Sequence, residues 1–411
     1  MTGASRAIGR APTREGDGPA GGSGRILLAI CPAAFIAVLS SYALGPFFPQ
    51  VASELGTSIA LLGQVPALLN GTAAVLGLAM GPLADRFGNR LMLLAGTAAA
   101  ALGALATGLA PTFELLLLAA IFGALGRAVV APVALAIVGA RFSGLARTRA
   151  MSYVVAALSG SAIVGIPALT TIAALADTWR AAFGALAAAA LLTLLLSTLL
   201  LPSDGEPEGH ASRSTLLGAY GPLVRHYPTL GVIGATFLRG TFIWILATYL
   251  GAFLIEQHGL SSQQAGFGYT GLGSGHFFGS LLAGRLLGTL PPRPLIGGLM
   301  PLAALGFSAA LVAPVGPIVA IGLAACGTML LGIVEATSMT LLISESPAGR
   351  ATTMTANQSA NSLGTAVGGG VGGLLLATGG YPALGLGIPI FAAAAVLVLW
   401  ASRPRLAANQ P

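Results

Sequence analysis

Charge is scarce in this sequence, and lysine is absent from it altogether. Only 8% of the 411 residues are charged, whereas about 25% are charged in ordinary soluble domains. A water-soluble fold of this size could not cover its surface with so few charges, so that class is excluded. Hydrophobic residues make up 55% of the chain, which fits a protein that is solvated by lipid.

Cysteine and histidine are also rare. The two cysteines, Cys31 and Cys326, fall in apolar runs, which excludes a disulfide framework and a cysteine-rich metal site. The four histidines are scattered without the spacing of metal ligands, so we expect no metal and no cofactor. The sequence contains no nucleotide-binding loop and no cluster of catalytic side chains. We therefore expect a protein that is not an enzyme and that draws its energy from a gradient.

Long apolar runs are what the sequence has in abundance. A membrane-spanning helix needs about 20 mostly apolar residues. The longest polar stretch separates the sixth such run from the seventh. The prediction is an all-α membrane protein with twelve transmembrane helices in two six-helix halves. The predicted spans are 26–48, 58–80, 91–110, 114–140, 149–174, 181–201, 229–254, 264–287, 294–313, 317–342, 351–378 and 383–401.

This segmentation also gives the domain organisation. We expect a disordered basic tail (1–25), an N-terminal six-helix bundle (26–201), a cytoplasmic linker (202–228), a C-terminal six-helix bundle (229–401) and a cytoplasmic tail (402–411). Nearly all arginines of the loops and tails fall on the side of the two termini, which is the positive-inside pattern. We therefore expect a monomeric, multi-pass protein of the cell (inner) membrane with both termini cytoplasmic. The net charge of +7 then reflects topology, and no nucleic-acid binding is expected.

One short charged motif, GPLADRFGNR, lies between the second and third spans. It is either a simple turn with cytoplasmic arginines or a functional element. It resembles the signature loop of the major facilitator superfamily, G-x-L-a-D-r-x-G-r-k. That resemblance implies the major facilitator fold and a conformational latch in which Asp85 and Arg86 make charged contacts at the cytoplasmic side. The matching residues are Gly81, Leu83, Ala84, Asp85, Arg86, Gly88 and Arg90.

The two halves echo each other around this motif. The stretch GRLLGTLPPRPL, which begins at Gly284, takes the matching place 203 residues later. It has Gly288 where the aspartate would stand, so we expect any latch there to be weaker. Duplicated six-helix units are a recurring plan among transporters, with the substrate site between the halves near the bilayer midplane.

The fifth span carries a second resemblance. GSAIVGIPALTTIAALADTWRAAF, from Gly160 to Phe183, has a G-x-P element at Gly165 and Pro167 and a W-R-x-x-F turn. It is similar to the twelve-helix drug and sugar efflux permeases, the arabinose-efflux-like and drug:proton antiporter group. This resemblance implies proton-coupled efflux of a small-molecule substrate by alternating access. Uptake by proton symport or facilitated diffusion is the alternative.

Three charged residues lie well inside predicted spans: Arg127, Arg239 and Glu335. A charge at the bilayer centre costs about 2.5–3.5 kcal/mol on insertion scales, so each needs a partner or water. The resemblance places their spans, the fourth, seventh and tenth, around the central cavity. We predict Glu335 to be a proton-coupling carboxylate or the counter-ion of one of the arginines; a purely structural ion pair is the alternative. Two arginines against one glutamate favour an anionic, zwitterionic or neutral polar substrate over a lipophilic cation.

Weaker candidates complete the predicted site. His276 either titrates near neutral pH or bonds a neighbouring helix. The residues that can hydrogen-bond or stack with a substrate, or alternatively with another helix, are Tyr42, Asn70, Trp244, Tyr249, Asn357 and Asn361. Residues predicted to pack or hinge helices are Gly165, Pro167 and two four-residue repeats, Gly271, Gly275 and Gly279 with Gly364, Gly368 and Gly372.

Overall fold

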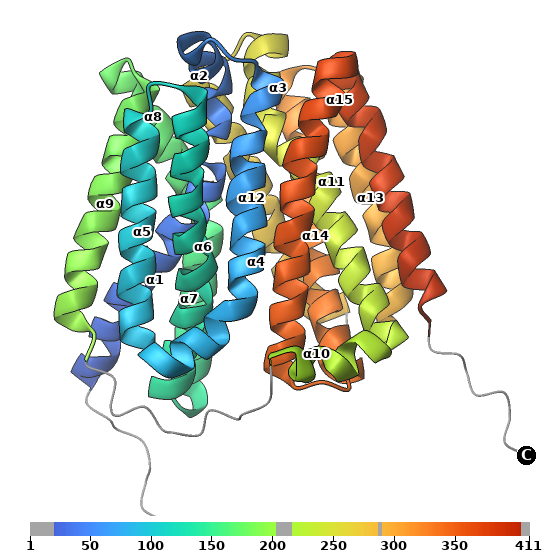
Figure 1. Ribbon diagram of the computed structural model, residues 1–411. Helices are drawn as coiled ribbons and strands as arrows, with labels where there is room; N and C mark the ends of the chain where they lie inside the picture. Colours follow the sequence, from blue (N-terminus) through green and yellow to red (C-terminus); the bar gives the residue numbers. More distant parts are fainter. Residues whose placement is uncertain (1–19, 203–215, 287–289, 404–411) are drawn as a thin grey trace, which may run out of the picture.

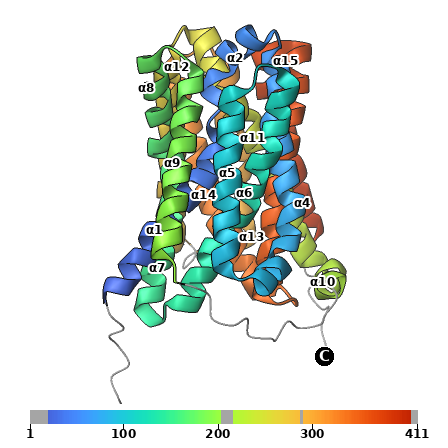
Figure 2. The ribbon, with the colours of Figure 1, turned by 60° about the vertical axis from the view of Figure 1, so that its left-hand side comes forward.

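The computed structural model describes residues 20–202, 216–286 and 290–403, and every regular element in these ranges is a helix. The long helices run side by side as rods in one bundle (Figure 1). In the N-terminal half, α9, α5, α6 and α4 stand next to one another along one face (Figure 2). The elements of this half are α1 (Ala20–Tyr42), η1 (Gly45–Phe47), α2 (Phe48–Leu55), α3 (Ile59–Leu62), α4 (Gln64–Phe87), α5 (Asn89–Leu109), α6 (Phe113–Arg141), α7 (Gly144–Gly160), the π-helical turn η2 (Ser161–Gly165), α8 (Ile166–Ala176) and α9 (Trp179–Leu200).

The C-terminal half follows a short connecting helix, α10 (Leu216–Arg225). Its elements are α11 (Tyr227–His258), α12 (Ser262–Leu286), α13 (Pro292–Val312), α14 (Pro317–Glu345) and α15 (Arg350–Ala401). The last of these is two helices that run in opposite directions (Figure 1), because the backbone leaves the helical region at Gly379 and Gly380. Gly380 has φ +65° and ψ −162°, a combination that glycine adopts most readily.

Ten segments of the described chain are long and apolar enough to cross a membrane. The segment Thr352–Ala401 is one of them, and it contains the reversal at Gly379 and Gly380. The helix α12 is not one of them, although it packs on α11 and α14 in the bundle, because glycine and polar residues lower its hydropathy. Counting both arms of α15 and α12 gives the expected twelve helices; that all twelve cross the membrane stays a prediction.

Some predicted boundaries need correction. The tail was expected to extend to residue 25, but α1 already begins at Ala20. Adding residues to an existing helix gains one hydrogen bond for each residue that is fixed, so a helix readily extends beyond its apolar run. The linker was expected to end at residue 228, but it contains α10, and α11 begins at Tyr227. Residues 1–19, 203–215, 287–289 and 404–411 lie outside the described part of the chain.

Glycines bring pairs of helices into close contact. A Cβ atom at Gly275 or Gly279 of α12 would meet the backbone carbonyl of Ala325 or Met329 in α14. Likewise, a Cβ atom at Gly364 or Gly368 would bring α15 against backbone carbonyls of α11, and at Gly372 it would meet the Tyr249 ring. Both four-residue repeats therefore lie at contacts within the C-terminal half, where the missing side chains let the helix backbones touch.

This contact gives a stability prediction. Gly279→Ala should lower the free energy of unfolding by about 1–3 kcal/mol, because the added methyl group has no space and α12 must move away from α14. The measurement is the thermal unfolding midpoint of the purified protein in detergent. Gly322→Ala is the matched control, since Gly322 lies inside α14 and a Cβ atom there meets nothing within 4 Å. An equal midpoint for the two variants would show that the close contact is not needed.

The fifth-span motif produces a contact between the halves. Proline has no backbone N–H, so Pro167 cannot donate the helical hydrogen bond to the carbonyl of Ile163, four residues earlier. That carbonyl instead accepts a hydrogen bond from Thr270 Oγ1 of α12, at 2.9 Å. Gly165 ends the π-helical turn, and a Cβ atom there would collide with Phe35 and Leu39 of α1. The G-x-P element therefore lets α1 pack closely against Gly165, and it leaves the carbonyl of Ile163 free to accept the hydrogen bond from α12.

The halves also meet at the end of the bundle that lies away from the first residue of α1 and the last of α15 (Figure 1). Tyr249 Oη of α11 donates to Gly369 O of α15 at 2.8 Å and also, between the halves, to Ala60 O of α3 at 3.3 Å. A Cβ atom at Gly251 would meet the backbone of Gly45 and Pro46. We call this end, formed by η1, α2, α3, α11 and α15, the outer seal, where outer means the end away from the start of α1 and the end of α15. In contrast, α6 packs on α1, α4, α5 and α7, and α14 packs on α11, α12, α13 and α15, each within its own half.

Candidate functional site

The charged residues inside the bundle come from α6, α11 and α14. Glu335 of α14 contacts two side chains of neighbouring helices: its Oε2 is 2.9 Å from Arg239 Nη1 of α11 and 3.0 Å from His276 Nε2 of α12. The Arg239 side chain is only 4% exposed, whereas those of Glu335 and His276 remain 27% and 33% exposed. Arg239 is therefore enclosed by the protein, whereas the side chains of Glu335 and His276 remain partly accessible to solvent.

Arg127 of α6 is held differently. Its Nε donates to Asn70 Oδ1 at 3.3 Å, and Asn70, fully buried in α4, donates its own amide to Pro66 O at 2.8 Å. No carboxylate of the described chain forms an ion pair with Arg127. Asn70 fixes the guanidinium without neutralising it. The positive charge of Arg239 is balanced by Glu335, and that of Arg127 is not.

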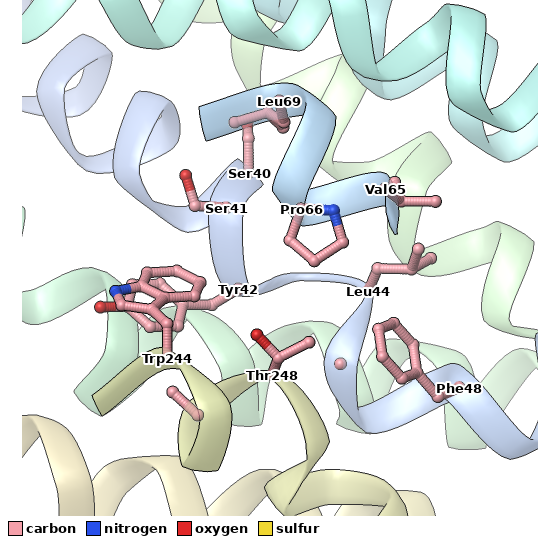
Figure 3. Close-up of a pocket in the computed structure, with 12 residues that line it drawn as sticks. Ser40, Ser41, Tyr42, Leu44, Phe48, Val65, Pro66, Leu69, Trp244 and Thr248 are labelled. Atoms are coloured by element: carbon pink, nitrogen blue, oxygen red, sulfur yellow. The ribbon is translucent and has the colours of Figure 1, made fainter. Parts of the chain in front are cut away.

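Tyr42 lies near both Arg127 and Glu335. It is close enough to Arg127 and to Glu335 that the charges of both act on its hydroxyl group. Its ring stacks on Trp244 of α11 with a centroid distance of 4.7 Å and an interplanar angle of 25° (Figure 3). Because Tyr42 ends α1 and Trp244 belongs to α11, the stack joins the two halves. The charged side chains of both halves therefore border one shared region beside this aromatic pair.

The family follows from comparison with known sequences. The family model of the Major Facilitator Superfamily matches residues 30–356 and 232–411. The chain belongs to this superfamily. It is therefore a multi-pass membrane protein of a transporter family, and it is not an enzyme.

Two curated relatives come from Bacillus subtilis (strain 168). The MFS-type transporter YceJ is 25% identical over 248 residues, which are 60% of this chain and 63% of YceJ. Multidrug resistance protein 1 is 28% identical over 184 residues, which are 45% of this chain and 46% of that protein. Each match spans less than two thirds of the relative.

Solved structures share the fold of this facilitator. A nucleoside transporter, NupG, superposes with a TM-score of 0.75 at 15% sequence identity, covering 92% of this chain and 100% of that one. A bacterial homolog to the human lysosomal transporter Spinster, in an inward-facing and unoccupied conformation, gives a TM-score of 0.72 at 17% identity, covering 94% and 96%. At these identities the likeness concerns the fold alone.

The signature loop of this facilitator is described in part. α4 ends at Phe87, and Gly88 follows with φ +83°, a backbone angle that suits glycine. The side chain of Asp85 lies outside what the structure describes, so the latch assigned to Asp85 and Gly81 stays a prediction. The Arg86 guanidinium lies over the ring of Phe87, with its Cζ atom 5.4 Å from the ring centroid.

Arg90 and its counterpart Arg293 each donate hydrogen bonds to carbonyl oxygens near the end of a helix in their own half. Arg90 donates to the carbonyl oxygens of Thr198 and Leu201 at the end of α9, at 2.9 and 3.1 Å. Arg293, 203 residues later, donates to Leu399 O near the end of α15 at 3.2 Å and pairs with Glu345 at 2.7 Å. The last carbonyls of a helix have no partner within the helix. In each half an arginine supplies one, as the repeated sequence pattern leads one to expect.

The remaining predicted site residues differ in what their side chains contact. Asn361 Oδ1 accepts from Arg239 Nη2 at 3.2 Å and so supports the ion pair. Asn357, one turn earlier, is buried, and its Oδ1 has no hydrogen-bond partner among the residues that the structure describes. Tyr249 is buried, and its hydroxyl group is engaged in the outer seal, so it is not positioned to contact a substrate in this conformation. Sequence reasoning singled out His276 without its partner, because periodicity does not show which helices face each other.

The outer seal supplies a second prediction. Tyr249→Phe removes a hydroxyl group whose longer hydrogen bond, to Ala60 O at 3.3 Å, joins the two halves. Its loss, worth at most about 1 kcal/mol, should raise the population with an open outer end by up to about fivefold. Hydrogen–deuterium exchange of residues 56–63 should become correspondingly faster. Tyr381→Phe is the control, since Tyr381 bonds Glu256 at 2.7 Å within the C-terminal half. Unchanged exchange in Tyr249→Phe would show that this hydroxyl group does not hold the halves together.

Proposed function

We propose that this facilitator is a secondary transporter that carries a small organic anion together with a proton by alternating access. The observation that supports the anion is the unbalanced charge of Arg127, whose hydrogen-bond partner is the neutral Asn70. The proton is assigned to Glu335, whose Oε2 lies 3.0 Å from His276 Nε2; both side chains are partly exposed.

The sign of the coupling follows from the charges. Protonation of Glu335 removes its negative charge and leaves the positive charge of Arg239, so the net charge near Tyr42 rises by one. Two unit charges about 10 Å apart at an effective dielectric constant of about 20 interact by about 1.7 kcal/mol, or roughly 15-fold in affinity. An anion therefore binds better to the protonated protein and, by reciprocity, raises its proton affinity. Cooperative binding of this kind is what symport requires.

A second candidate is export of a neutral or zwitterionic solute by proton antiport. The similarity to Multidrug resistance protein 1 and the G-x-P element of the fifth span favour it. Antiport requires the solute to displace the proton, and a solute with an ammonium group near Glu335 would do so.

We place both termini on the cytoplasmic side of the cell membrane and expect a monomer. α1 begins and α15 ends at the same end of the bundle (Figure 1). Arg86, Arg141, Arg147 and Arg225 lie at helix ends or connections on that side, and loops rich in arginine stay in the cytoplasm.

The test is flux in proteoliposomes with benzenesulfonate as the probe. This anion stays ionised at all relevant pH values and does not cross lipid as a neutral acid. Symport predicts accumulation in a lumen that is alkaline relative to the outside, and collapse of the gradient by a protonophore should abolish it. Accumulation in an acidic lumen would support antiport instead. Equal uptake under both gradients would overturn proton coupling.

A further inference from the structure

A small pocket lies beside the Tyr42–Trp244 stack, near the outer seal. Figure 3 shows the two aromatic rings on one side of it and the apolar side chains of Leu44, Phe48 and Val65 on the other. It has room for one small polar group and not for a whole solute. Its walls come from α1, η1, α2, α4 and α11, and therefore from both halves: Ser40, Ser41, Tyr42, Leu44, Gly45, Phe48, Val65, Pro66, Leu69, Trp244, Ala247 and Thr248.

Two buried hydroxyl groups on these walls have no hydrogen-bond partner among the described residues. Ser41 is 6% exposed and Thr248 is 3% exposed, and neither Ser41 Oγ nor Thr248 Oγ1 forms a hydrogen bond in the described chain. Burying a hydroxyl group without a partner is unfavourable.

The pattern is unusual for these helices. A serine or threonine inside a helix normally donates to the carbonyl four residues earlier. Ser40 does so to Ile36 O at 2.9 Å, and Thr241, two turns before Thr248 in α11, does so to Phe237 O at 3.1 Å. Ser41 and Thr248 are the two unpartnered buried hydroxyl groups of the described chain, and both line the same pocket.

We infer that Ser41 and Thr248 form a subsite for an uncharged hydrogen-bonding group of the transported solute, such as a phenol or alcohol hydroxyl. The inference rests on the proposed function, since it concerns the uncharged end of the solute that function requires. The body of the solute lies against the half-buried ring of Tyr42, and its charged end lies toward Arg127, whose charge acts on the same tyrosine.

The position of the two hydroxyl groups also has a conformational consequence. Ser41 belongs to the N-terminal half and Thr248 to the C-terminal half. A group that bonds both binds best while the outer seal keeps the halves together. Such a ligand shifts the population toward the sealed conformation by the difference in its affinity for the two states.

The experiment compares matched probes that differ by one hydroxyl group. The anionic pair is benzenesulfonate and 4-hydroxybenzenesulfonate, and the neutral pair is benzenesulfonamide and 4-hydroxybenzenesulfonamide. A cationic pair is trimethylanilinium and its 4-hydroxy derivative. Dissociation constants are measured on the purified full-length protein, on Ser41→Ala, on Thr248→Val and on the control Thr241→Val.

Wild type and Thr241→Val should bind the hydroxylated member of a pair about 3- to 10-fold more tightly, as expected for a neutral hydrogen bond. Ser41→Ala and Thr248→Val should each lose most of this preference while binding of the unhydroxylated member changes little. A preference in the neutral or cationic pair alone would support the hydroxyl subsite and contradict the proposal that the solute is an anion. No hydroxyl preference in any pair, or a preference that both variants retain, would overturn the subsite.

Discussion

Glu335→Gln should abolish the pH-driven accumulation of benzenesulfonate, leaving only the level found in protein-free liposomes. Glutamine cannot take up a proton, so the change of charge that links proton and anion disappears. The same substitution leaves Arg239, which is 4% exposed, without its carboxylate at 2.9 Å. Breaking a buried ion pair by removing one partner costs about 3–5 kcal/mol. The measurement is flux under an imposed pH gradient, with the unfolding midpoint recorded in parallel.

A double variant separates the two effects. Glu335→Gln combined with Arg239→Gln removes both charges, so the unfolding midpoint should return toward the wild-type value. Its pH-driven accumulation should still be absent, because the titrating carboxylate is missing. Wild-type accumulation in either variant would show that Glu335 is a structural ion pair and that the proton binds elsewhere.

Arg127→Gln should have the next largest effect, on anion affinity. A hydrogen bond to a charged group contributes about 1.5–3 kcal/mol, so the dissociation constant for benzenesulfonate should rise roughly 10- to 150-fold. Binding of the neutral benzenesulfonamide should change little, because it gains nothing from the positive charge. Calorimetric titration of the purified protein with both probes measures the two constants.

Arg127→Lys is the matched control for charge. Lysine keeps the positive charge but presents one ammonium group in place of a planar guanidinium. It should retain part of the anion affinity and lose the orientation that Asn70 imposes on Arg127 through the 3.3 Å contact. A parallel loss of benzenesulfonate and benzenesulfonamide binding in Arg127→Gln would contradict an anion site and indicate a damaged fold.

Most helices of the fold could be predicted from the composition and from the lengths of the apolar runs. Every predicted span corresponds to observed helix, because lipid requires a long apolar segment wherever the chain crosses it. The helix α12 shows the limit of this criterion: glycines that let it touch α14 also lower its hydropathy. The start of α1 at Ala20 was missed for a related reason, since a helix can extend beyond its apolar run.

The charged residues of the site could be found in the sequence, but their partners could not. An intramembrane charge is conspicuous because it is costly. Which arginine neutralises Glu335 depends on how α11 and α14 are rotated, and the structure shows Arg239. Ser41 and Thr248 gave no signal, because serine and threonine in helices usually bond their own backbone. Tyr249 was expected near the substrate, yet its hydroxyl group bonds across the outer seal.

The sign of proton exchange on anion binding shows whether the anion and the proton bind cooperatively. Benzenesulfonate is added to the purified, weakly buffered protein between pH 5 and pH 8, and the change in pH is recorded. The groups that face Glu335 are Arg239 of α11, His276 of α12 and Tyr42 of α1. We expect proton uptake by the wild type and none by Glu335→Gln. Proton release by the wild type, or binding without any exchange across this range, would contradict it.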